Sequence, residues 1–264
     1  MSTKPAKTSK NKKRRSKPTR RKTRPSVDAP SVHPWRVCPY GEHWVKTHPM
    51  HVPPSKTHPE GTVTTRHEHC ADNPSGKDQL YTDEIQEISS RHFSNLKNKP
   101  CPLSLKFENG NMYDDLIAGW VQYWNEVIKP SEALDPNLIK ALVASESGFD
   151  PEILANKENQ NSARGLTQVT NATRRILGDD KGELKDHYVN VTREDLNIPS
   201  VNICAGIRWL FQKRILSSAR LERQATWLET VYDYKAASKG TKSEAQKIMR
   251  IFLEKYEDLQ KCGS

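Results

Sequence analysis

The sequence has little of what marks a membrane protein or a disulfide-stabilised one. No apolar run approaches the roughly 20 residues of a membrane-spanning helix, and the N-terminal stretch lacks the apolar core of a secretory signal. The five cysteines are an odd number scattered over 264 residues, which does not resemble a disulfide framework. Internal repeats and the strand–helix alternation of a parallel sheet are missing too. What remains is enough chain for one or two domains with a sizeable core.

Acidic residues are absent from the first 25 positions, where twelve lysines and arginines lie. The formal charge of the whole chain is +10, so the residues after Pro25 carry a balance of about −2. With almost nothing apolar to bury, residues 1–27 are expected to form a disordered basic tail. The tail is either a solvated polycation or a contact for nucleic acid or another anionic polymer. By itself it does not make the chain a DNA-binding protein.

Residues 28–79 form an irregular segment that is rich in His, Pro and Cys and poor in aliphatic residues. Short extended pieces such as "GTVTTRH" are expected to pair as a small hairpin. One interpretation of this segment is a structural zinc site, with ligands Cys38, His43, His69 (or His67) and Cys70. Their spacing matches no common zinc finger. The alternative is a loop-rich appendage with surface histidines, and no other cofactor is expected.

Residues 80–264 have helical periodicity. The stretch 111–129 carries apolar residues at three- and four-residue steps and ends before Pro130. A further helix is predicted to begin with Asp135 as its N-cap and Pro136 in the first helical position. Gly148 ends that helix. Thr82 and Thr170 are expected to cap two other helices.

Glu146 lies in the last turn of this helix, on the face that carries Leu138 and Leu142. The macrodipole favours cations at a helix C-terminus, and burial disfavours a carboxylate, so the pKa of Glu146 should rise. A carboxylic acid that stays protonated near neutral pH suits protonation of a glycosidic oxygen. The alternative is a structural glutamate that reaches solvent or accepts bonds from nearby backbone amides.

Four motifs in order resemble those of the lysozyme-like soluble lytic transglycosylase (SLT) domain. They are Glu-Ser-Gly-Phe at 146–149, Gly-Leu-Thr-Gln-Val at 165–169, Asn-Ile-Cys-Ala-Gly-Ile-Arg-Trp-Leu at 202–210, and a partial match, Asp-Tyr-Lys-Ala-Ala, at 233–237. The resemblance covers roughly residues 112–256. It implies a mainly α, lysozyme-like domain that acts on bacterial peptidoglycan.

The resemblance also implies roles for five residues. Glu146 would be the catalytic acid and base, cleaving the bond between N-acetylmuramic acid and N-acetylglucosamine with formation of a 1,6-anhydro ring. Ser147 would orient the acid or contact the sugar, and Gly165 would allow close approach of backbone to sugar or simply make a turn. Gln168 would hold an N-acetyl group, and Tyr234 would point its hydroxyl toward Glu146.

Three positions depart from the family pattern. Thr167 replaces a methionine, Lys235 an asparagine, and Ala237 a glycine. A cation beside Glu146 would lower the pKa of that carboxyl and weaken the acid step. Lys235 could instead face solvent or the acidic peptide stem of the substrate. These departures put full activity in doubt, although they leave the fold expectation unchanged.

The sequence therefore predicts a peptidoglycan lytic transglycosylase behind a basic tail. The alternatives are a hydrolytic muramidase of the same fold and a noncatalytic glycan- or envelope-binding module. The expected partner is the peptidoglycan strand, and the expected site of action is the bacterial cell wall. Without an evident signal, the route there would be specialised export, a phage or mobile-element setting, or release by lysis.

Overall fold

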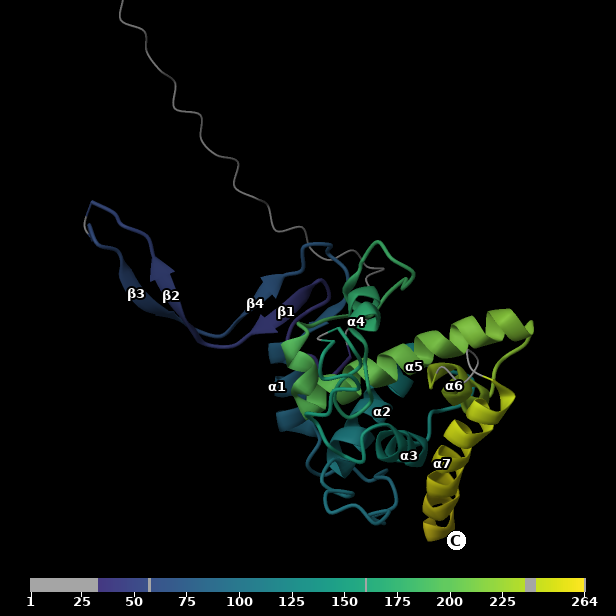
Figure 1. Ribbon diagram of the computed structural model, residues 1–264. Helices are drawn as coiled ribbons and strands as arrows, with labels where there is room; N and C mark the ends of the chain where they lie inside the picture. The colour runs from purple at the N-terminus through teal and green to yellow at the C-terminus, as the bar shows by residue number, and fades with distance from the viewer. Residues whose placement is uncertain (1–32, 57, 160, 236–240, 264) are drawn as a thin grey trace, which may run out of the picture. The chain divides into compact units, whose positions relative to one another are not determined.

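The computed structural model describes residues 33–263 except 57, 160 and 236–240. The basic tail predicted for residues 1–27 lies outside the described residues, and so does Ala237. Residues 31–264 belong to one compact unit. Its described part is mainly helical, as predicted (Figure 1).

Seven α-helices occur in the described residues, and their positions follow the predicted periodicity (Figure 1). They are α1 (Thr82–His92), α2 (Asp114–Ile128), α3 (Pro136–Glu146), α4 (Asn171–Gly178), α5 (Pro199–Leu221), α6 (Trp227–Tyr234) and α7 (Lys242–Gln260). Short 3₁₀ turns lie at Glu194–Asn197 (η1) and Lys261–Gly263 (η3).

Six short strands in the described residues pair two by two. They are β1 (Glu42–Val45), β2 (His48–Val52), β3 (Thr62–Arg66), β4 (His69–Asp72), β5 (Gln79–Tyr81) and β6 (Tyr188–Asn190). β1 pairs with β4 and β2 with β3, both antiparallel, which confirms the hairpin expected around Gly61–His67. β5 and β6 pair in parallel and thereby join the strand segment to the helical part.

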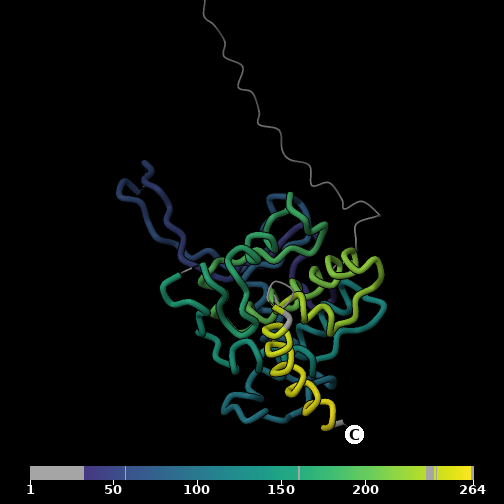
Figure 2. The backbone as a smooth tube through the Cα atoms, turned by 45° about the vertical axis from the view of Figure 1, so that its right-hand side comes forward, coloured from purple at the N-terminus to yellow at the C-terminus, as the bar shows by residue number. Residues whose placement is uncertain are grey.

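The core is built around α5, which is buried along most of its length. Two buried tryptophans of α2 donate their indole N–H groups to this helix: Trp120 to the Ser200 hydroxyl at 2.9 Å, and Trp124 to the Cys204 carbonyl at 3.1 Å. α7 packs along α3 on another side of the domain (Figures 1 and 2). Apolar burial on this scale is the main stabilising contribution to such a domain.

Two of the three predicted N-caps are present in the structure. The Asp135 carboxylate accepts a hydrogen bond from the Asn137 N–H, and the Thr170 hydroxyl accepts one from the Thr173 N–H. The predicted Thr82 cap is wrong. Thr82 is already inside α1, and its hydroxyl donates to Asp195 at 2.7 Å, a residue 113 positions away. The Thr82 hydroxyl thus bonds a residue that is distant in sequence in place of a backbone N–H of its own helix.

The expectation that the cysteines do not form a disulfide framework is also wrong. Cys38 pairs with Cys70 and Cys101 with Cys262, while Cys204 is free and buried. The second disulfide spans 161 residues and ties the segment before α2 to the end of the chain. Sequence spacing does not reveal pairing at such a separation, because proximity of the two Cα atoms is decided by the fold.

A buried ion cluster attaches the strand segment to the helices. The Arg36 guanidinium, which is almost fully buried, forms ion pairs with Glu84 of α1 and with Asp78. His187, just before β6, lies with its Nδ1 2.9 Å from the second Asp78 oxygen. Burial raises the pKa of the Asp78 carboxyl, but hydrogen bonds and charge from His187 and Arg36 outweigh it and hold that pKa below its usual range.

Candidate active site

Glu146 is the last residue of α3, and its side chain is 17% exposed. Burial raises the pKa of the Glu146 carboxyl, and the positive charge of Lys235 opposes that rise without cancelling it. A protonated carboxyl is therefore present at a higher pH than in a free glutamate. This is the property that the helix-end position predicted.

Lys235 brings a cation to this carboxyl from 89 residues farther along the chain. The residue follows α6 directly, and its Nζ lies 2.6 Å from Glu146 Oε1 and 3.1 Å from the Ser145 hydroxyl. Its side chain is only 6% exposed, so it faces the acid and not solvent. The departure from the family pattern therefore acts directly on the candidate catalytic group.

The Glu146-Ser147-Gly148-Phe149 motif forms the corner where the chain leaves α3. The buried Ser147 hydroxyl donates to the Val143 carbonyl at 3.1 Å and accepts from the Phe149 N–H at 3.2 Å. Gly148 and Phe149 both have positive φ, 59° and 66°, which is unusual for a phenylalanine. The complete burial of Phe149 holds this conformation. Ser147 thus closes the helix end, which fixes the position of the acid.

Asn202 of α5 holds the turn that contains the second motif. Its amide nitrogen donates to the carbonyls of Arg164 at 3.0 Å and Leu196 at 2.8 Å. Its amide oxygen accepts from the Thr167 N–H at 2.8 Å and the Thr167 hydroxyl at 2.6 Å. All four bonds involve buried groups, so the turn over residues 164–169 is rigidly attached to the central helix.

Two motif glycines let α5 and this turn approach each other. Gly165 has φ +70°, and a Cβ there would lie 2.3 Å from Asn202 Nδ2 and 2.5 Å from the Leu196 carbonyl oxygen. At Gly206 a Cβ would lie 2.2 Å from the Thr167 hydroxyl. The Gly165 position thus serves a turn and close packing against Asn202. Thr167, which replaces the family's methionine, exchanges apolar packing for a hydrogen bond from its hydroxyl to Asn202 Oδ1 at 2.6 Å.

Gln168 follows in a left-handed conformation, φ 52°, and is half-buried. Its amide nitrogen donates to the Gly165 carbonyl at 2.9 Å and the Ile153 carbonyl at 3.3 Å. The side chain therefore stays with the turn, and its nitrogen is occupied by backbone partners.

Tyr234 connects this turn to the residue that pairs with the acid. Its hydroxyl donates to the Thr167 carbonyl at 2.7 Å and not to Glu146 as expected. Burial and the nearby Glu146 charge raise the pKa of the Tyr234 hydroxyl. Because Lys235 is the next residue, the contact to Thr167 also sets the place from which Lys235 reaches Glu146.

The structure thus brings all five sequence-predicted residues into one connected region. α3 supplies Glu146, with Ser147 at its end; the turn supplies Gly165 and Gln168; and α6 supplies Tyr234. Asn202 was missed as an organising residue, although it stands first in the third motif. Its signal was present, since an asparagine in an apolar helical register must find buried partners.

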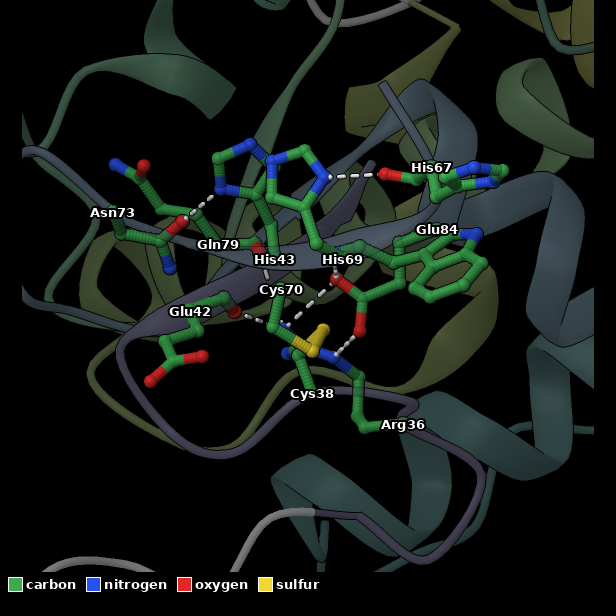
Figure 3. Close-up of a disulfide and its surroundings, with 11 residues drawn as sticks. Arg36, Cys38, Glu42, His43, His67, His69, Cys70, Asn73, Gln79 and Glu84 are labelled. Carbon is green, nitrogen blue, oxygen red and sulfur yellow. Dashed lines mark hydrogen bonds and ion pairs between the residues drawn. A yellow bond between two sulfur atoms is a disulfide. The ribbon is translucent and has the colours of Figure 1, made fainter. Parts of the chain in front are cut away.

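Cys38 and Cys70, two of the four residues named as zinc ligands, are joined by a disulfide in this structure (Figure 3). Zinc is bound by thiolates, and neither sulfur is a thiolate in this structure. The Nδ1 of His43 lies 2.8 Å from Asn73 Oδ1, and the Nδ1 of His69 lies 2.9 Å from a backbone carbonyl oxygen two residues earlier. Within the described ranges, no group of three or more His, Cys, Asp or Glu is arranged to hold a metal.

Comparison with protein families agrees with this arrangement. The family model described as "Transglycosylase SLT domain" matches residues 123–252. Residues 123–252 form a transglycosylase SLT domain. The match begins in α2, ends in α7 and includes Glu146, the turn and Lys235. No curated protein and no solved structure matches the chain significantly.

The SLT domain accounts for the lysozyme-like helical architecture, as the resemblance predicted. The strand segment lies outside the matched residues: β1 to β5 all precede residue 123. The strands before α1, called here the added strand segment, are held to the helices by the Arg36 cluster and by the β5–β6 pairing.

Proposed function

We propose that this SLT domain is a lytic transglycosylase that cleaves bacterial peptidoglycan between N-acetylmuramic acid and N-acetylglucosamine. The observation that carries the proposal is the Glu146 carboxyl. It is fixed at the end of α3, mostly buried, and has a raised pKa. A carboxyl that is protonated at mildly acidic pH can deliver a proton to a leaving oxygen.

In the first step, the Glu146 proton moves to the glycosidic oxygen, and the C1–O bond of the muramyl residue breaks. The N-acetyl oxygen of the same sugar stabilises the positive charge at C1, because the family motifs contain no second carboxylate. Substrate-assisted glycosidases follow this scheme. Ser147 fixes the end of α3 and thereby the position of Glu146. Gln168 is part of the turn that borders the sugar site.

In the second step, the Glu146 carboxylate accepts the proton of the muramyl 6-hydroxyl. The 6-oxygen then bonds to C1, the N-acetyl group is released, and a 1,6-anhydro ring forms without consumption of water. Glu146 is protonated again, so the cycle closes with no cofactor. Tyr234 and Gly165 hold the turn in place through both steps.

The ion pair to Lys235 favours one alternative, a noncatalytic glycan-binding module. The pair stabilises the carboxylate, which is the wrong form for the acid step. Burial opposes this effect of Lys235, and the pKa of Glu146 is raised overall. The raised pKa favours the protonated form that catalysis needs. A hydrolytic muramidase of the same fold would use the same acid and differ only in its product.

Digestion of purified sacculi, followed by mass spectrometry of the products, tests the proposal. We expect 1,6-anhydromuramyl ends from the wild type and none from Glu146→Gln. The matched control is Glu152→Gln, which changes an exposed glutamate six positions away and should digest normally. Reducing muramyl ends would indicate the muramidase, and binding without any products would indicate the binding module.

We further propose that the protein acts at the cell wall and that residues 1–27 contact anionic polymers. Twelve cations without an acid support the second proposal. Across the described residues, no helix combines the length and the apolar character needed to span a bilayer.

A further inference from the structure

A groove of about 960 Å³, whose lining does not include Glu146, lies where the added strand segment meets the SLT domain. Its walls come from the end of β1, the start of α1, α4, and the stretch 190–198. Ligand sites in proteins have volumes of roughly 300–1,000 Å³, so this one has room for a sizeable molecule. Eight of its nineteen lining residues precede residue 123 and are therefore outside the family match.

Two adjacent arginines of α4, Arg174 and Arg175, line the groove without a carboxylate partner among the described residues. Arg174 donates from Nε to the Asn171 amide oxygen at 2.8 Å and from Nη1 to the Val191 carbonyl at 2.9 Å. Both partners are neutral, so they orient the guanidinium but leave its charge uncompensated. Arg175 is exposed. A bidentate guanidinium is well suited to a carboxylate.

The acidic residues of the groove are already engaged. Asp83 lies 3.1 Å from the Lys46 ammonium, and the Asp195 carboxylate accepts bonds from Thr82 and from the backbone of Thr192. Glu194 pairs with its neighbour in the chain and remains 66% exposed. The groove therefore carries both signs of charge, with a positive surplus at α4. This pattern suits a ligand with one or two carboxylates better than a polyphosphate, which needs a continuous row of cations.

Aromatic side chains also line the groove. Tyr81 stacks on His43 with ring centroids 3.9 Å apart, and Trp44 also lines the groove. The Trp44 indole N–H is buried and has no acceptor in the described part of the chain. Aromatic faces offer a flat apolar surface for the C–H face of a sugar or for an alanine methyl group. β1 is held in place by its pairing with β4, where Trp44 lies opposite the disulfide-bonded Cys70.

We propose that this groove binds the acidic peptide stem of peptidoglycan, with stem carboxylates on Arg174 and Arg175 and the stem's apolar parts against Trp44 and Tyr81. The proposal rests on the proposed function for its choice of polymer. The added strand segment would then supply a second contact to the wall, separate from the glycan site at Glu146. Stem-bearing strands would be retained by the groove, while naked glycan would be recognised by the SLT site alone.

The test is a set of binding measurements by calorimetry with the full-length protein. The probes are the free stem tetrapeptide, a disaccharide-tetrapeptide and a tetramer of N-acetylglucosamine, which has no carboxylate. Arg175→Glu should weaken binding of both peptide-bearing probes at least about tenfold, the effect of losing one charge-assisted bond, and leave the sugar tetramer unchanged. The matched control is Lys247→Glu on α7, an exposed charge reversal outside the groove, which should bind all probes normally.

Unchanged tetrapeptide binding by Arg175→Glu would overturn the proposal, as would the absence of tetrapeptide binding by the wild type. Equal dependence of inorganic polyphosphate binding on Arg175 would also overturn it, because the groove would then be a general anion site. Glu146→Gln should bind the tetrapeptide like the wild type. If sacculi are not cleaved but tetrapeptide binding still depends on Arg175, the catalytic proposal fails and the groove proposal stands.

Discussion

The ammonium of Lys235 lies 2.6 Å from the carboxylate of Glu146, and both side chains are largely withdrawn from solvent. Because such a pair is partly desolvated, removing either member leaves the other charge without compensation. The pair therefore links the stability of the α3–α6 junction to the protonation of the candidate catalytic acid.

Glu146→Gln should abolish most turnover and also destabilise the fold. Loss of a positioned acid and base is expected to reduce turnover by roughly 10²-fold to 10⁴-fold. The Lys235 ammonium then has no counter-charge, which should lower the free energy of unfolding by about 1–3 kcal/mol. Urea unfolding measures this change. The double variant Glu146→Gln/Lys235→Met should regain part of the loss, and equal stability of wild type and Glu146→Gln would show that the pair contributes nothing.

Lys235→Asn should raise the pKa of Glu146 further. The Lys235 charge favours the ionised carboxyl, so its removal leaves burial unopposed and extends the protonated form to higher pH. If proton delivery limits turnover, the alkaline limb of the kcat/KM profile should move to higher pH. Lys157→Asn, at an exposed lysine, is the control. An alkaline limb that stays in place or moves to lower pH would mean that Lys235 does not hold down the pKa of Glu146.

Asn202→Ala should loosen the turn that carries Gly165 and Gln168. The change removes four buried hydrogen bonds and leaves the Thr167 N–H without a partner, at a cost of about 2–4 kcal/mol. Thermal unfolding and hydrogen exchange of residues 164–169 measure the effect. Asn109→Ala, at an exposed asparagine, should change neither. Normal protection of the turn in Asn202→Ala would contradict its role as the organising residue.

Thiol counting should give one cysteine per chain after denaturation without reductant, and none that reacts rapidly in the native protein. Cys204 is the free thiol and is fully buried, while the other four cysteines are paired. Replacing both Cys38 and Cys70 by Ser should cost about 3–4 kcal/mol, given the 32 residues between them, and should expose β1 and β4 to proteases. Five free thiols together with bound zinc would restore the metal interpretation.

Removal of residues 1–27 should leave the thermal transition and the activity on soluble glycan fragments unchanged. The tail contains none of the residues proposed for the site, and its twelve cations act through long-range charge. Any loss should appear with intact walls and fade at high salt. A lower unfolding temperature for the truncated protein would refute the separation of tail and domain.

Local chemistry in the sequence determined much of this protein. The spacing of apolar residues predicted the helices, Asp135 and Pro136 marked where α3 begins, and Gly148 marked where it ends, because capping and left-handed turns depend on neighbouring residues. The position of Glu146 on that helix, and the rise in its pKa, followed from the same local reasoning. The motif order was sufficient for the family.

Contacts between distant residues were decided by the tertiary structure. Lys235 reaches Glu146, Thr82 bonds Asp195, and Cys101 meets Cys262 across 89, 113 and 161 residues respectively. Each of these contacts depends on how whole helices pack. Two side chains three or four residues apart are brought together by the helix itself. Two that are a hundred residues apart meet only because burial of the core packs their elements together. Sequence alone therefore indicated Glu146 as the candidate acid, and packing placed the cation of Lys235 against it.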